Sequence, residues 1–133
     1  MIIKICGIKN KNTLLCLEKN NVDFFGMIFY PKSPRNISLE NAKNLLQTSE
    51  GLNIDGVGVF VNNNFNEIEE IIKKLKLRFV QLHGSEDEGY IKALKKIGVR
   101  VIKSISISSK EDLRKIDKYK NVDYFLFDYK PLT

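Results

Sequence analysis

The sequence contains only two cysteines, Cys6 and Cys16, and neither belongs to a Cys-x-x-Cys pair or to a cluster of cysteine and histidine. A disulfide framework needs several cysteines at regular spacings, and a structural zinc site needs closely spaced pairs of ligands. The spacing therefore suggests neither a disulfide framework nor a zinc site. We expect both thiols to be reduced, and we expect no bound metal.

Long apolar runs are also missing. The longest apolar stretches are far too short to cross a bilayer, and the first residues lack a basic segment followed by an apolar one. Nothing in the pattern therefore indicates a transmembrane helix or a secretory signal. We expect a soluble protein of the cytoplasm with no membrane partner.

Acidic residues are in the minority, and the net charge is +6. The positive charge comes from 18 lysines and four arginines spread along the chain, and its densest clusters fall near the predicted ends of helices, where cations are favourable. No aromatic residues or recognition motifs accompany these clusters, so we expect no nucleic-acid partner. A milder use of the positive field is attraction of a phosphorylated small molecule.

What the sequence does contain is a regular alternation of apolar strands and amphipathic helices. Its 133 residues are 43% hydrophobic, which suits one domain with a core of its own. The strands are predicted over residues 2–6, 24–30, 56–61, 78–82, 99–104 and 124–128. Five helices lie between them, which gives a (βα)5β order over residues 1–133.

The helices are predicted from periodicity and from capping residues. The third is the clearest, because Ile68, Ile71, Ile72 and Leu75 lie at i, i+3, i+4 and i+7. The predicted N-caps are Asn12 or Thr13, Ser38, Ser85 with Glu88, and Ser109 with Asp112.

This order allows two parallel-sheet architectures, an open doubly wound sheet or part of a (β/α)8 barrel. A dinucleotide-binding doubly wound fold would carry Gly-x-Gly-x-x-Gly after the first strand, and Cys6-Gly7-Ile8-Lys9-Asn10 does not match it. Polar residues instead recur at the ends of strands, as barrel enzymes require. We expect one barrel mouth to be ringed by Cys6, Arg35, Asn62, His83 and Asp128.

Side chains alternate across a strand, so Lys4 and Cys6 share a face, as do Gln81 and His83. A thiolate and a carboxylic acid that meet in one cavity, here Cys6 and Asp128, could act as general base and general acid. Plainer interpretations remain open: Cys6 as a small buried hydrophobe, and Asp128 paired with a lysine. Three interpretations of Lys4 are open: it pairs with Asp128, it binds an anion of the substrate, or it points to solvent below the barrel.

Five segments together resemble the phosphoribosylanthranilate isomerase family. They are Lys-Ile-Cys-Gly at 4–7, Phe-Phe-Gly-Met-Ile-Phe-Tyr-Pro-Lys-Ser-Pro-Arg at 24–35, Gly-Val-Phe-Val-Asn at 58–62, Val-Gln-Leu-His-Gly at 80–84 and Phe-Leu-Phe-Asp at 125–128. The resemblance implies a (β/α)8 barrel and an Amadori rearrangement in tryptophan biosynthesis. The substrate would be N-(5-phosphoribosyl)anthranilate and the product 1-(2-carboxyphenylamino)-1-deoxyribulose 5-phosphate, with no metal or cofactor. Other phosphosugar barrels, such as ribulose-phosphate epimerase and indole-glycerol-phosphate synthase, lack the Lys-Ile-Cys-Gly segment.

The resemblance also implies a role for each candidate residue. Asp128 would protonate the ring oxygen of the furanose, and Cys6 would remove the proton from C2 of the opened sugar. Arg35 would face the carboxylate of the anthranilate, a task that suits a planar bidentate donor. Gln81 and His83 would line the mouth, and we do not expect His83 to be essential.

The last part of the family pattern is not found after Asp128. A Gly-Gly-Thr/Ser-Gly turn and two further βα units, which carry the phosphate site, would follow there, whereas this sequence ends at Thr133. The expectation is an incomplete barrel, either a fragment or half of a split enzyme with a complementing C-terminal fragment. The alternative is an inactive chain that self-associates through the open edges of its sheet.

Overall fold

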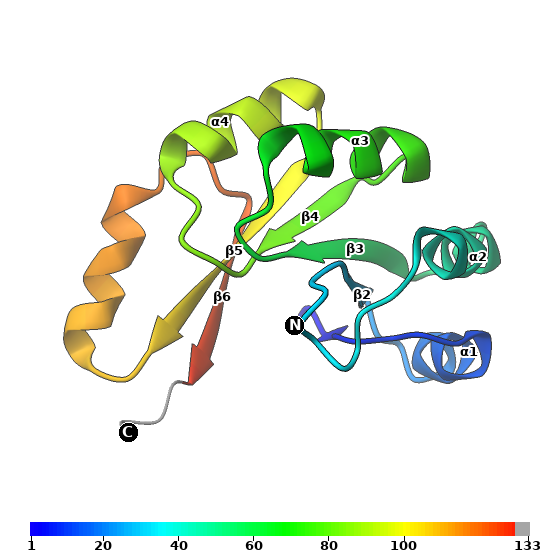
Figure 1. Cartoon of the computed structure of the whole chain (residues 1–133). Helices are drawn as coiled ribbons and strands as arrows, with labels where there is room; N and C mark the ends of the chain where they lie inside the picture. The colour runs from blue at the N-terminus through cyan, green and yellow to red at the C-terminus, as the bar shows by residue number, and fades with distance from the viewer. Residues whose placement is uncertain (130–133) are drawn as a thin grey trace.

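The computed structural model describes residues 1–129, in which strands and helices alternate as predicted (Figure 1). The elements are β1 (Lys4–Ile5), α1 (Lys11–Lys19), β2 (Phe24–Ile28), α2 (Leu39–Ser49), β3 (Asp55–Phe60), α3 (Phe65–Leu75), β4 (Phe79–Leu82), α4 (Glu88–Ile97), β5 (Arg100–Ile107), the 3₁₀ helix η1 (Lys110–Lys118) and β6 (Tyr124–Tyr129). Within residues 1–129, no helix has the length and apolar character needed to span a membrane.

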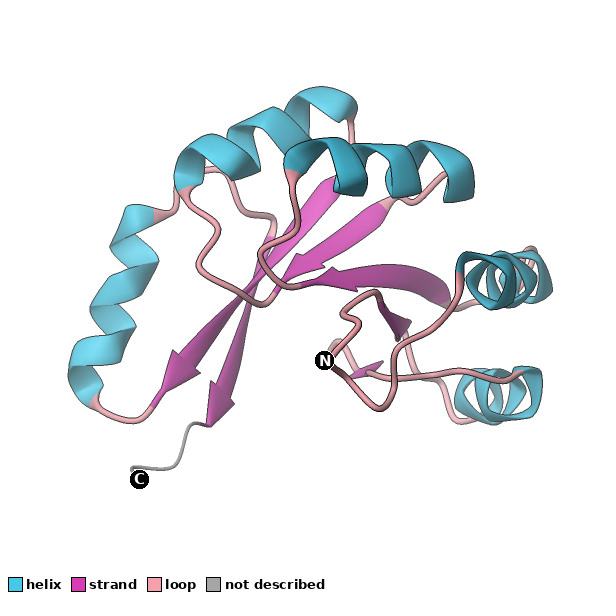
Figure 2. Ribbon diagram, viewed as in Figure 1, coloured by secondary structure: helices cyan, strands magenta, loops and turns pink. Residues whose placement is uncertain are grey.

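The six strands form one parallel sheet in the order β1-β2-β3-β4-β5-β6. Each strand pairs with the next one in the chain, whereas the strand order of a doubly wound sheet reverses at a switch point. The barrel-type alternative is therefore correct. The five helices lie along the outer side of the curved sheet and leave its inner side free of helices (Figure 2).

Alternation of side chains divides the apolar residues into two clusters. The larger cluster fills the space between the sheet and the helices, with Phe25 and Phe60 from the strands packed near Ile68 and Leu94 from the helices. The smaller one lies on the inner face, at the amino-terminal half of the strands. It consists of Phe24, Val57, Phe79 and Ile102, with Tyr124 and Leu126 packed against it. Above this cluster, the inner face carries a mixture of polar and apolar side chains.

Two of the predicted helix caps are wrong. The N-cap of α1 is Asn10, whose Oδ1 accepts a hydrogen bond from the Thr13 N–H at 2.9 Å. The N-cap of α4 is Asp87, because Ser85 donates its hydroxyl and its backbone N–H to Asn62 Oδ1 and cannot serve as a cap. The cap of α2 at Ser38 is confirmed.

The cap of η1 is confirmed as well, since the Asp112 carboxylate accepts a hydrogen bond from the backbone N–H of Ser109 at 3.0 Å. The strand boundaries differ from the prediction by at most three residues. The largest difference is at β5, which continues to Ile107 because it pairs with β6 as far as Tyr129.

A buried ion pair on the outer face fixes the loop that follows β4. Lys103 Nζ on β5 lies 3.5 Å from Glu86 Oε1, and both side chains are 2% exposed. Lys103 also donates to the Gly84 carbonyl at 2.6 Å, and Glu86 accepts from the backbone N–H groups of Gly84 and Asn62, each at 2.9 Å. Burial lowers the pKa of Lys103, and Glu86 opposes that change. The pair therefore joins the loops after β3 and β4 to the middle of β5.

We predict that Glu86→Gln destabilises the protein, because it leaves the Lys103 ammonium buried beside a neutral group. Breaking a buried pair in this way costs about 3–5 kcal/mol of the free energy of unfolding. The matched control is Glu69→Gln, which removes the exposed i,i+4 pair with Lys73 and should cost about 0.3–0.5 kcal/mol. Urea denaturation measures both. Equal losses in the two variants would show that the buried pair does not stabilise the loop.

Candidate active site

All five candidate residues, Cys6, Arg35, Gln81, His83 and Asp128, line one cavity at the carboxyl ends of the strands. Its volume is about 310 Å³, and its walls come from β1, β2, β3, β4 and β6 and from the loops that follow β1, β2, β3 and β4. Both edge strands contribute, so the sheet curves far enough to bring the thiol and the carboxylate to the same space. The arrangement matches the general position of sites in barrels of this type.

Cys6 lies directly after β1, in a turn held by the backbone. Gly7 has a φ of +78°, a conformation that favours glycine, and its N–H donates to the Gly26 carbonyl at 3.0 Å. The thiol is partly buried and is not in a disulfide. It lies over Gly26, since a Cβ placed on Gly26 would be 2.9 Å from Cys6 Sγ and 3.1 Å from Lys4 Nζ. Glycine at position 26 therefore makes room for two polar side chains.

Arg35 reaches the cavity from the loop between β2 and α2. The loop is shaped by hydrogen bonds from the Ser33 N–H to the Tyr30 carbonyl at 2.9 Å and from the Arg35 N–H to Ser33 Oγ at 3.1 Å. The guanidinium donates to the Cys6 carbonyl at 3.3 Å and packs against Gly7, where a Cβ would lie 2.6 Å from Arg35 Cδ. Any side chain at position 7 would displace the arginine from this place.

Polar side chains from β4, the loop after it and β6 form the other wall. Gln81 Nε2 donates to Ser104 Oγ at 2.9 Å and lies 3.4 Å from His83 Nδ1. His83 Nε2 lies 3.9 Å from Asp128 Oδ2, which is an ion pair when the imidazole is protonated. No lysine of residues 1–129 forms an ion pair with Asp128, so the alternative of a lysine partner is not observed. Buried Gln81 Oε1 has no hydrogen-bond partner within the same residues.

Lys4 points into the cavity, so the alternative of solvent below the barrel is wrong. It lines the same space as Cys6, and it forms no ion pair with Asp128 or any other carboxylate of residues 1–129. Burial is the largest influence on its ammonium group and lowers its pKa, whereas the neighbouring Cys6 raises it. The alternation of side chains in the sequence predicted that Lys4 and Cys6 share a face, but it did not predict whether that face points into the barrel.

Asn62 is the one predicted mouth residue that does not line this cavity. Its backbone has a φ of +52°, and its side-chain Oδ1 accepts hydrogen bonds from the N–H and hydroxyl of Ser85 at 2.7 and 3.1 Å. These bonds tie the loop after β3 to the loop after β4. Asn62 therefore has a structural task close to the mouth, and the prediction of a place in the ring is wrong.

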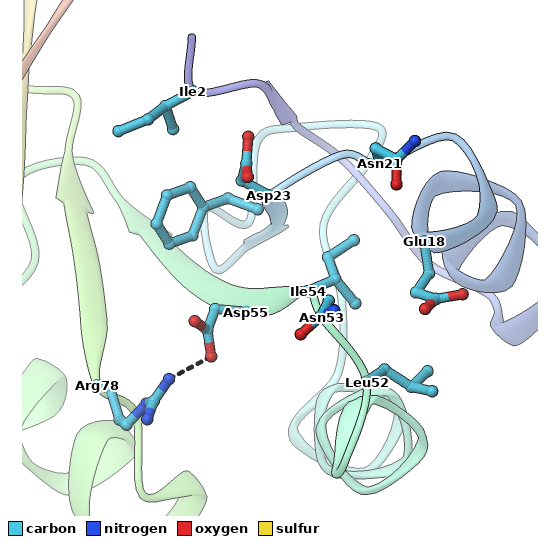
Figure 3. Close-up of a pocket in the computed structure, with 10 residues that line it drawn as sticks. Ile2, Glu18, Asn21, Asp23, Leu52, Asn53, Ile54, Asp55 and Arg78 are labelled. Carbon is cyan, nitrogen blue, oxygen red and sulfur yellow. Dashed lines mark hydrogen bonds and ion pairs between the residues drawn. The ribbon is translucent and has the colours of Figure 1, made fainter.

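A larger cavity lies at the opposite end of the sheet, near the amino ends of β2 and β3 (Figure 3). Its volume is about 620 Å³, and two of its acidic side chains, Asp55 and Asp23, already have partners. Asp55 pairs with Arg78, and Asp23 Oδ2 accepts a hydrogen bond from the Ile3 N–H at 2.8 Å. Polar groups at this end of a barrel usually serve stability, and no candidate residue lies there.

No group of three or more potential metal ligands of the His, Cys, Asp and Glu types comes together anywhere in residues 1–129. The donors at the candidate site are instead a thiol, a carboxylate, an imidazole, a guanidinium and an ammonium. Such a set can exchange protons and bind an anion. Acid–base chemistry on an anionic small molecule is the chemistry that the geometry suits.

Comparison of the sequence with known proteins identifies a family. Residues 3–131 match the family model described as N-(5'phosphoribosyl)anthranilate (PRA) isomerase. The N-(5'-phosphoribosyl)anthranilate isomerase of Trichodesmium erythraeum is 38% identical over 132 residues, which cover 96% of this chain and 57% of the relative. That of Sinorhizobium fredii is 39% identical over 133 residues, which cover 98% and 59%.

Solved structures agree with the sequence comparison. The phosphoribosyl anthranilate isomerase of Thermotoga maritima superposes with a TM-score of 0.90 at 32% identity, over 99% of this chain and 63% of that one. An isomerase solved with reduced 1-(o-carboxyphenylamino)-1-deoxyribulose 5-phosphate superposes with a TM-score of 0.87 at 33% identity, over 98% and 66%.

The chain thus spans less than two thirds of the length of the curated relatives described above, although nearly all of it is matched. The match covers every strand and helix of the sheet and includes the segments that carry Cys6, Arg35, Gln81, His83 and Asp128. The chain belongs to the N-(5'-phosphoribosyl)anthranilate isomerase family.

Proposed function

We propose that this chain supplies the acid–base groups of a phosphoribosylanthranilate isomerase. The reaction is the Amadori rearrangement of N-(5'-phosphoribosyl)anthranilate to 1-(2-carboxyphenylamino)-1-deoxyribulose 5-phosphate, a step of tryptophan biosynthesis. The observation that carries the proposal is that Cys6 and Asp128, from the two edge strands, line the same cavity. Binding of a reduced product analogue by a relative of the same fold supports a small-molecule substrate.

Asp128 acts first in this proposal, as the general acid. Its carboxyl group gives a proton to the ring oxygen of the furanose while the bond from C1 to that oxygen breaks. The lone pair of the anthranilate nitrogen forms the second bond to C1, which leaves an iminium ion. Asp128 suits this step because it is exposed to the cavity on the inner face of β6, and a substrate can approach it directly.

Cys6 acts second, as the general base. The iminium ion draws electrons from C1, so the proton on C2 becomes acidic and can pass to the thiolate. The electrons of the C2–H bond form the C1–C2 double bond of an enolamine, and the iminium nitrogen recovers its lone pair. The enolamine then takes up a proton at C1 and loses the proton of its C2 hydroxyl, which gives the ketone. A thiolate is a competent base near neutral pH, whereas a hydroxyl group is not.

Arg35 binds the anthranilate carboxylate in this proposal. Its guanidinium is held against Gly7 and the Cys6 carbonyl, at the side of the cavity that also contains the thiol. Planar carboxylates and guanidinium groups pair through two parallel hydrogen bonds, which fixes orientation as well as distance. Gln81 and His83 line the same cavity, and His83 lies near Asp128, where it can help to orient the acid.

The proposal includes a cytoplasmic location and self-association of the chain. A thiol that acts as a base must stay reduced, which the cytoplasm ensures. The partner in self-association is a second copy of the chain. Phe127, which is 52% exposed on the edge strand β6, supports such a contact. A dimeric isomerase is known from Thermotoga maritima.

The function is tested by complementation of a tryptophan auxotroph that lacks the isomerase. The chain is expressed alone and together with a second polypeptide, which is the part of the Trichodesmium relative that the match does not cover. We expect growth without tryptophan when both are present, because the second polypeptide supplies the phosphate-binding loops that barrels place after strands seven and eight. The second polypeptide alone is the control. Absence of growth with both soluble polypeptides, while the intact relative restores growth, would contradict the proposal.

We predict that Cys6→Ser and Asp128→Asn each remove most of the turnover. General acid and general base groups contribute about 100- to 10,000-fold to the rate, so kcat should fall by about that factor in either variant. The effect is measured as product formation by the purified chain together with the second polypeptide. Cys16→Ser is the matched control, since Cys16 lies on α1 outside the cavity and its replacement should leave kcat unchanged. Near wild-type turnover in Cys6→Ser would disprove its assignment as the base.

We predict that Arg35→Ala weakens capture of the substrate. The loss of a charge-assisted hydrogen bond costs about 1.5–3 kcal/mol, which lowers kcat/KM by about 10- to 150-fold. Lys32→Ala is the control, because Lys32 lies in the same loop and does not line the cavity. If Arg35→Ala changes neither KM nor kcat, the arginine does not contact the substrate.

A further inference from the structure

Lys4 is the charged residue of β1, and it faces the same side as Cys6, which directly follows the strand. A single residue separates the two, so both point to the inner side, and both line the candidate cavity. The position of a Cβ on Gly26 would be 3.1 Å from Lys4 Nζ and 2.9 Å from Cys6 Sγ. The ammonium and the sulfur therefore lie no more than about 6 Å apart, over the same glycine.

A partly buried ammonium needs a partner that can accept hydrogen bonds or carry negative charge. Among residues 1–129, Lys4 forms no ion pair with a carboxylate, and the side chain that Asp128 approaches is the imidazole of His83. Arg35 also faces this space, but it is a cation, and its guanidinium donates to the Cys6 carbonyl. The thiol of Cys6 is the neighbouring group that can become an anion. Burial lowers the pKa of Lys4, and Cys6 opposes the change, in agreement with this pairing.

We propose that Lys4 is a positioning residue that holds Cys6 as a thiolate by donating a hydrogen bond to its sulfur. The role in catalysis rests on the proposed function, whereas the pairing of ammonium and thiolate does not. A cation beside a cysteine favours the thiolate, which is the form that can remove a proton from carbon. The same contact fixes the sulfur over Gly26, which leaves its free lone pairs directed to the cavity.

The pairing is tested by the rate at which Cys6 reacts with iodoacetamide as a function of pH. Cys16→Ser provides the background, because the chain has two cysteines and Cys6 is then its only thiol. We expect Lys4→Met to move the midpoint of the pH profile upward by about one pH unit, the effect of removing an opposite charge at this separation. Lys4→Arg, which keeps the charge, should retain the original midpoint. Lys9→Met removes an exposed lysine outside the cavity and is the matched control.

An unchanged midpoint in Lys4→Met, with circular dichroism showing a folded protein, would overturn the proposal. If methionine at position 4 prevents folding, Lys4→Gln gives the same comparison with a neutral polar group. Titration of the thiolate by its ultraviolet absorbance is an independent measurement of the same quantity in the same variants.

The kinetics of the isomerase test the catalytic part separately. A residue that acts through Cys6 should lower kcat in Lys4→Met and leave KM nearly unchanged, with recovery in Lys4→Arg. A rise in KM with unchanged kcat would show that Lys4 binds the substrate and does not act through Cys6. Because alkylation needs no substrate, a shifted midpoint without isomerase activity would contradict the proposed function and support the pairing. Isomerase activity with an unshifted midpoint would support the proposed function and contradict the pairing.

Discussion

The parallel register of the sheet is the constraint on which the site depends. Each strand pairs with its successor in the same direction, so every strand ends at the same edge and the following loops gather there. Alternation then divides each strand between an inner and an outer face. The larger apolar cluster lies on the outer face, and the smaller one lies on the lower part of the inner face. Polar side chains at the upper end of the inner face, among them Cys6, Gln81 and Asp128, meet in the cavity.

Small residues decide how closely the groups of the site can approach one another. Gly26 lies under Cys6 and Lys4, and Gly7 lies under Arg35, so a side chain at either position would collide with a proposed functional group. At these two positions a glycine provides no apolar side chain for packing, and polar groups occupy the space. A strand segment that combines Lys4 and Cys6 over a glycine contributes little to the core, and it is stabilised instead by the backbone bonds of Gly7 and Ile8 to Gly26.

Periodicity predicted the order of all the strands and helices, because most of them have an apolar face that must be buried. The exception in type is η1, a 3₁₀ helix with no buried residue. The N-caps of α1 and α4 were harder to predict, because several polar residues lie near the start of each helix. Only the hydrogen bonds of the folded chain show which of them is the cap. Asn62 was predicted to ring the mouth because it lies at the end of a strand. Its side-chain oxygen instead accepts a hydrogen bond from Ser85 of the next loop. The pair of Lys103 and Glu86 has no local pattern at all, because the two residues are 17 positions apart and meet only in the folded chain.

The proposed acid and base lie on β6 and β1, the two edge strands of the described sheet, and no ladder of hydrogen bonds in residues 1–129 joins these strands. Their separation is therefore set by the curvature of the whole sheet. The inner apolar cluster controls that curvature at the lower end, where Phe24 and Phe79 pack edge to face at 4.8 Å and Tyr124 of β6 packs against the cluster. At the upper end, the ion pair of Lys103 and Glu86 fixes the loop after β4, which begins with His83. Residues far from the cavity thus determine whether a single substrate can touch both groups, which explains why so much of the chain's apolar pattern serves the geometry of a few polar side chains.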